Sequence, residues 1–150
     1  MTTDAAFPRA PLALAPHFSA RPWGGTRLRD TLGFDVPADG GPYGEAWTLS
    51  DHPGGRSTVA SGPFAGQQFG DVLRAHPLAM IGRQHAPARY PLLVKAIDAA
   101  EDLSIQVHPD DARAPQGDRG KTECWYIIDC DANAEIIYGV DPEATLEDLQ

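Results

Sequence analysis

Glycine and proline residues interrupt this chain so often that the pattern favours turns over long helices. The 150 residues include 15 glycines and 14 prolines, and several of these recur between positions 40 and 66. Short β-prone pieces lie among them, at residues 46–50 and 57–60. Because glycine and proline favour tight turns and end regular segments, the sequence predicts a mainly β fold of short antiparallel strands with short helices.

The later part of the chain carries segments of strand length joined by polar turns. These are residues 92–98, 103–108, 122–129 and 134–140. Such a succession is typical of a β-meander or of part of a barrel. One helix is predicted before them, over residues 67–76, where apolar side chains recur at helical spacing and Pro77 follows as a stop.

The two ends of the chain differ from this pattern. Residues 1–22 contain four prolines, at positions 8, 11, 16 and 22, and are predicted to form an irregular arm. Residues 145–150 are predicted to start a helix, because Thr145 and Asp148 occupy the positions of a capping box, but the sequence stops within that turn. Between the arm and this helix, residues 40–140 form the expected β-rich core of a single domain.

Composition narrows the classes of partner. With 12 basic and 21 acidic residues the net charge is −9, which disfavours a nucleic-acid-binding surface. No apolar run reaches the roughly 18 residues of a membrane span and no signal-peptide pattern is present, so we expect a cytoplasmic protein without a membrane partner. Cys124 and Cys130 have the spacing of neither a disulfide framework nor a cysteine zinc site, and we predict that both thiols are buried.

Residues 103–109 are the most informative for chemistry. Strand alternation places Ser104, Gln106 and His108 on one face, each about 6.5–7 Å from the next. A glutamine oxygen and a histidine nitrogen at this spacing are able to bind one metal ion. The simpler alternative is that His108 is an ordinary surface or core histidine.

A returning segment, residues 120–128, supplies further polar groups. Lys121 and Glu123 share one face of this predicted strand. If it pairs antiparallel with the strand before it, Glu123 reaches the same ion as Gln106 and His108, with Lys121 alongside. This donor set suits Zn²⁺ and leaves a fourth position for another ligand or water. The alternative is a salt bridge between Lys121 and an acidic neighbour such as Glu123.

Five motifs follow one another in the order seen in type I mannose-6-phosphate isomerases, also called phosphomannose isomerases. They are residues 23–26, 44–55, 91–99, 103–110 and 120–126. The sequence therefore resembles that family over about residues 17–140. The resemblance implies a cupin-type β-barrel, or jelly roll, present here as an incomplete N-terminal portion. It also implies one zinc ion per chain and interconversion of mannose 6-phosphate and fructose 6-phosphate through a cis-enediol.

The resemblance also implies roles for individual residues. The implied zinc ligands are Gln106, His108 and Glu123, and the implied residues of the sugar-phosphate pocket are Ser104, Lys121 and Lys95. Lys121 is in addition the expected catalytic residue, and a small-molecule sugar phosphate is the expected partner. For Lys95, which interrupts an apolar run, the alternative is a bond to Asp98 or another acid.

The sequence departs from the family in one respect. The family's fourth zinc ligand, a histidine, and an important arginine lie on segments that follow the matched part, yet no histidine follows His108 and no arginine follows Arg119. We therefore expect the N-terminal part of a longer protein. Two other functions fit the same residues: a non-catalytic cupin-like fragment that binds metal or sugar phosphate, and a cupin-type glucose-6-phosphate isomerase.

Overall fold

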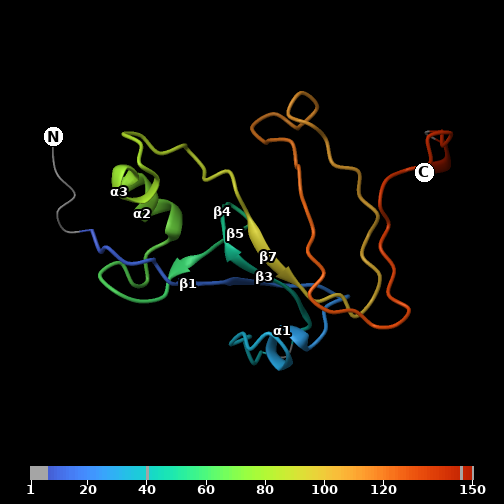
Figure 1. The fold of residues 1–150 in the computed structure, drawn as a ribbon, viewed down its shortest axis with the longest axis horizontal. Coiled ribbons are helices and arrows are strands. Elements are labelled where there is room, and N and C mark those ends of the chain that lie inside the picture. Colours follow the sequence, from blue (N-terminus) through green and yellow to red (C-terminus); the bar gives the residue numbers. More distant parts are fainter. Residues whose placement is uncertain (1–6, 40, 146, 150) are drawn as a thin grey trace. The chain divides into compact units, whose positions relative to one another are not determined.

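The computed structural model describes residues 7–39, 41–145 and 147–149, and it divides into two compact units, Met1–Leu103 and Ser104–Gln150 (Figure 1). Strands dominate the regular structure of the first unit, and its helices are short. Within the described ranges, no helix combines the length and the apolar character that a membrane crossing requires.

The first unit contains three small antiparallel sheets. The largest has the order β2-β3-β7, and the other two pair β1 with β6 and β4 with β5. The strands are β1 (Leu14–Ala15), β2 (His17–Ala20), β3 (Tyr43–Leu49), β4 (Asp51–His52), β5 (Gly55–Arg56), β6 (Thr58–Val59) and β7 (Val94–Ile97). The strands predicted within residues 46–50, 57–60 and 92–98 are therefore confirmed as β3, β6 and β7.

Three short helices accompany these sheets: α1 (Arg27–Asp30), α2 (Phe69–Ala75) and α3 (Pro77–Ile81). Helix α2 confirms the helix predicted over residues 67–76. Helix α2 ends before Pro77, as predicted, and Pro77 then begins α3, since the first helical position needs no N–H donor. The buried apolar side chains come from α1, β3, β6 and α2, and they are Leu28, Ala46, Val59, Phe69, Val72 and Leu73.

The predicted irregular arm is wrong for part of residues 1–22. Residues 1–6 lie outside the described residues, but β1 and β2 occupy positions 14–15 and 17–20. Pro16 falls between the two strands, where its missing N–H interrupts neither ladder. The prolines therefore limit the strands in length without preventing β1 from pairing with β6 or β2 with β3.

The second unit lacks the strands predicted at residues 103–108, 122–129 and 134–140, so that prediction is wrong, and the described residues form no closed barrel. Large side chains there are exposed, with Ile105 at 74%, Tyr126 at 89% and Tyr138 at 95%. A β-prone segment gains stability only against a neighbouring strand and a packed face, and these segments have neither among the described residues. For the same reason Cys124 and Cys130 are exposed rather than buried.

The last described residues form a short 3₁₀ helix, η1 (Glu147–Leu149). The backbone N–H and the hydroxyl of Thr145 both donate to Asp148 Oδ2, each at 2.7 Å. The predicted capping pair is therefore present, whereas Leu146 and Gln150 lie outside the described residues.

Candidate functional site

Three of the predicted site residues meet in the second unit. His108 Nε2 lies 3.3 Å from Glu123 Oε1 and 3.0 Å from Lys121 Nζ. Lys121 Nζ lies 3.3 Å from Glu123 Oε2. The Lys121 backbone N–H donates to the Pro109 carbonyl at 3.1 Å, which holds the two chain segments next to each other. The structure thus joins these side chains across the loop, as the sequence predicts, without forming a sheet.

The distance between the histidine nitrogen and the glutamate oxygen tests whether zinc fits here. Two donors at about 2.0–2.2 Å from a tetrahedral zinc ion lie roughly 3.3–3.5 Å apart. The separation of 3.3 Å between His108 Nε2 and Glu123 Oε1 matches this value. The two side chains have the donor types and the separation of a pair of zinc ligands, a separation that a His–Glu ion pair also has. The alternative salt bridge is also observed, because the Lys121 ammonium contacts both of them.

Gln106 and Ser104 are bonded to each other. Gln106 Nε2 donates to Ser104 Oγ at 2.8 Å. An amide that donates through its nitrogen presents its oxygen as the acceptor, and that oxygen is the atom a metal ion binds. Within the described ranges, no group of three or more His, Cys, Asp or Glu side chains is placed to hold a metal ion. The third protein ligand that the sequence predicts beside His108 and Glu123 is the Gln106 amide, and that role stays a prediction.

Glu123 is favoured in its charged form. Partial burial raises the pKa of its carboxyl, but the hydrogen bond from Trp125 and the positive charge of Lys121 outweigh burial and lower the pKa below its usual value. Trp125 Nε1 donates to Glu123 Oε1 at 3.3 Å. Sequence reasoning missed this contact, although strand alternation places residues 123 and 125 on one face. The indole helps to orient the predicted anionic ligand.

Lys95 belongs to the first unit, where it pairs with an acid. Its ammonium lies 2.6 Å from Glu45 Oε1. Glu45 is 4% exposed, and its Oε2 accepts hydrogen bonds from Arg21 and from the indole of Trp47. This pairing is the alternative stated for a lysine in an apolar run, with Glu45 as the partner. A role for Lys95 in the sugar-phosphate pocket stays a prediction.

Sequence reasoning did not single out Glu45. The available signal was an acidic residue within an apolar strand, since a buried charge needs an opposite charge and hydrogen-bond donors. Burial raises the pKa of Glu45, but the bonds from Lys95, Trp47 and Arg21 lower the pKa by a larger amount. The net shift is therefore downward from the usual value of 4.5. Glu45 is thus held ionised between two cations.

We expect Glu45→Gln to lower the free energy of unfolding at pH 7 by about 1–3 kcal/mol, through loss of charge-assisted hydrogen bonds. Because the folded-state pKa is depressed, this stabilisation is present above pH 4.5 and is lost as pH falls further. Urea unfolding of both proteins at pH 7 and below pH 4 measures the difference, which should narrow in acid. Glu101→Gln, at an exposed position, is the matched control. A difference independent of pH would contradict the assignment.

The comparison with known families covers most of this chain. A sequence model of the catalytic domain of type I phosphomannose isomerase matches residues 12–135. The chain belongs to the type I phosphomannose isomerase family. All six predicted site residues of this phosphomannose isomerase family member lie inside the matched range.

Relatives of known name agree with the family assignment. Mannose-6-phosphate isomerase of Streptococcus mutans serotype c is 42% identical over 139 residues, which cover 91% of this chain and 43% of that protein. Mannose-6-phosphate isomerase ManA of Bacillus subtilis is 45% identical over 142 residues, or 93% of this chain and 42% of that protein.

A solved structure is similar as well. The crystal structure of the mannose 6-phosphate isomerase from Bacillus subtilis superposes with a TM-score of 0.75 at 45% identity, over 84% of this chain and 40% of that one. This member of the phosphomannose isomerase family therefore spans about two fifths of the length of the relatives it matches.

Proposed function

We propose that the protein is a zinc-dependent isomerase that interconverts mannose 6-phosphate and fructose 6-phosphate through a cis-enediol. The observation that carries this proposal is the cluster of His108, Glu123 and Lys121, in which two metal-type donors meet a cation. The cluster lies within the part of the chain that matches a catalytic domain. We further propose a cupin-type β-barrel fold for the protein.

In this proposal Gln106, His108 and Glu123 hold one zinc ion per chain, with a fourth position for another ligand or water. Aldose–ketose isomerisation moves a proton between C1 and C2, and the main obstacle is the weak acidity of the carbon next to the carbonyl group. Zinc would supply electrophilic stabilisation of the negative charge that develops on the substrate oxygens, worth several kcal/mol. The His108–Glu123 separation of 3.3 Å supports this ligand pair.

The remaining predicted residues bind and orient the sugar phosphate. The Lys121 ammonium lies beside both proposed ligands and is placed to donate to a substrate oxygen. Ser104 accepts from Gln106 and so orients that amide. The Lys95 ammonium, fixed by Glu45, is a candidate phosphate donor. Binding energy from the phosphate then helps to position the open-chain sugar.

The proposal includes a small-molecule sugar phosphate as the partner, no nucleic-acid or membrane partner, and a cytoplasmic location. The net charge of −9 supports the absence of a nucleic-acid partner, because a surface that binds a nucleic-acid phosphate backbone needs an excess of basic side chains. Because the chain is acidic overall, a phosphate group has to be bound by a few individually positioned basic side chains. Lys121 and Lys95 are the candidates.

The test uses the complete gene product. Metal is removed with a chelator, and fructose 6-phosphate formation from mannose 6-phosphate is followed with and without added Zn²⁺. We expect activity to disappear with the metal and to return with zinc, while glucose 6-phosphate is not converted. Absence of turnover in the zinc-loaded protein would overturn the isomerase proposal in favour of a binding protein. Conversion of glucose 6-phosphate instead would indicate the other isomerase.

A further inference from the structure

The register of β7 decides which way Lys95 points. In the observed pairing Lys95 lies opposite Trp47, Ile97 lies opposite Glu45, and an irregularity separates the Trp47 pair from the next pair, Leu49 with Val94. Lys95 therefore shares a face of the sheet with Glu45. A slip of one residue would move Lys95 to the opposite face.

The apolar pattern around β7 does not select this register by itself. Residues 92–94 before Lys95 are all apolar, as are residues 96 and 97 after it. Leu92 and Val94 are 57% and 51% exposed. The burial of these side chains therefore favours the observed pairing of β7 with β3 only weakly over a pairing shifted by one residue. A strand of only four residues with this apolar pattern has a weakly specified register. The Lys95–Glu45 pair and contacts at the two ends of the strand therefore fix it together.

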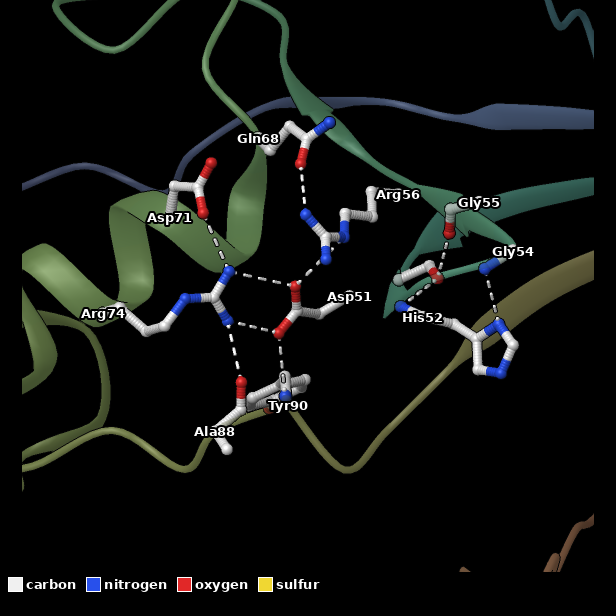
Figure 2. A network of polar contacts seen from close by, with 11 residues as sticks. Asp51, His52, Gly54, Gly55, Arg56, Gln68, Asp71, Arg74, Ala88 and Tyr90 are labelled. Carbon is white, nitrogen blue, oxygen red and sulfur yellow. Dashed lines mark hydrogen bonds and ion pairs between the residues drawn. The ribbon is translucent and has the colours of Figure 1, made fainter. Parts of the chain in front are cut away.

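A buried carboxylate holds the chain just before β7 (Figure 2). The Asp51 side chain, 1% exposed, lies 2.8 Å from Arg74 Nη1, and its Oδ2 accepts the backbone N–H of Tyr90 at 3.0 Å. Arg74 Nη1 also donates to the Ala88 carbonyl at 3.1 Å. The Tyr90 ring packs edge-on against Phe69 with centroids 5.2 Å apart. The connector from α3 to β7 is thus fastened at residues 88 and 90.

The anchoring carboxylate is itself tightly placed. A Cβ at Gly70 would lie 1.8 Å from Asp51 Oδ1, so α2 approaches the carboxylate at a position that only glycine allows. Arg56 Nε lies 3.9 Å from the same oxygen. Because an unpaired buried charge is very unfavourable, Asp51 is held where Arg74 and Arg56 neutralise it.

A second buried carboxylate follows the strand. Asp98, 7% exposed, accepts the Arg27 backbone N–H at 2.7 Å, and its own N–H donates to the Gly44 carbonyl at 2.9 Å. Between the two anchors, Pro91 restricts φ and each residue advances at most about 3.3–3.6 Å. Anchors at both ends therefore determine which residue of the strand lies opposite Trp47.

We propose that Asp51 is a positioning residue for Lys95. By holding Tyr90 directly and Ala88 through Arg74, it sets the β7 register that places the Lys95 ammonium beside Glu45. The consequence for catalysis rests on the proposed function, whereas the consequence for register does not.

The test compares Asp51→Asn with Asp71→Asn in the complete protein. Asp71 is the matched control because its side chain, 60% exposed, bonds Arg74 from the solvent side. We expect Asp51→Asn to lower hydrogen-exchange protection of the Tyr90 amide by about tenfold or more. Backbone NMR contacts between Trp47 and Lys95 should weaken, and contacts of Trp47 with a neighbour of Lys95 should appear. The control should leave both readouts unchanged.

Kinetics supply the functional readout. We expect Asp51→Asn to raise KM for mannose 6-phosphate by about tenfold and to change kcat less, because a misplaced Lys95 weakens phosphate binding. The positioning role would be contradicted if Asp51→Asn lowered kcat by as large a factor as it raised KM. It would also be contradicted if Asp71→Asn raised KM to the same extent. A parent protein without isomerase activity would remove the proposed function but leave the register experiment decisive.

Arg74→Lys keeps the charge pair with Asp51 and weakens the hold on Ala88, so it serves if Asp51→Asn fails to fold. In Arg74→Lys we expect the Trp47–Lys95 NMR contacts to weaken by a smaller amount, while the Tyr90 amide keeps its bond to Asp51. Full Tyr90 protection with intact Trp47–Lys95 contacts in Asp51→Asn, or intact Trp47–Lys95 contacts in Arg74→Lys, would overturn the proposal.

Discussion

Replacing His108 with alanine is expected to remove zinc from the protein and to lower kcat/KM by about a hundredfold or more. The side chain supplies the nitrogen of the donor pair that matches zinc in separation, 3.3 Å from Glu123 Oε1. Without it the proposed site keeps one carboxylate and one amide, a set that binds zinc weakly. Metal analysis of the purified variant, together with the rate of fructose 6-phosphate formation, measures both effects.

The matched control is His85→Ala, which removes an exposed histidine of the first unit. We expect it to retain one zinc ion per chain and full activity. A second ligand variant, Glu123→Gln, keeps the shape of the side chain and removes its charge, and it should also lose zinc. One zinc ion per chain in His108→Ala would show that the ligand set is wrong.

Local sequence patterns predicted the elements that depend on local contacts. Helix α2 was predictable from helical spacing, and β3 from a β-prone piece between glycines. Lys121, Glu123 and His108 meet across one loop, although the two strands on which that prediction rested are not formed. For α2 and for the loop cluster the interacting residues lie near one another in the sequence, whereas β3 takes its partners, β2 and β7, from distant segments.

The rest depends on pairing between distant segments. Glu45 gains Lys95 from a strand fifty residues later in the chain, as their contact shows. β2 forms within a proline-rich stretch because β3 offers it a partner. Residues 122–129 have strong β propensity yet form no strand, because propensity supplies no neighbouring backbone. None of these three outcomes can be predicted from the local pattern of the segment concerned.

Lys121→Met is expected to lower kcat/KM for mannose 6-phosphate by about ten- to a hundredfold, the equivalent of one lost charge-assisted hydrogen bond. Methionine keeps the apolar stem and removes the ammonium that lies 3.0 Å from His108 Nε2. Steady-state kinetics with mannose 6-phosphate measures the loss, and metal analysis measures zinc.

The zinc content separates the role of Lys121 from that of a ligand. Because the ammonium contacts both Glu123 and His108, its positive charge opposes a cation bound there. We therefore expect Lys121→Met to bind zinc at least as tightly as the parent protein while it turns over substrate more slowly. Arg119→Met removes the same charge from an exposed position two residues earlier and should change neither property. Loss of zinc in Lys121→Met, or unchanged catalytic efficiency, would contradict a substrate-binding role, since a side chain that only neutralises Glu123 would leave turnover of the zinc-loaded protein intact.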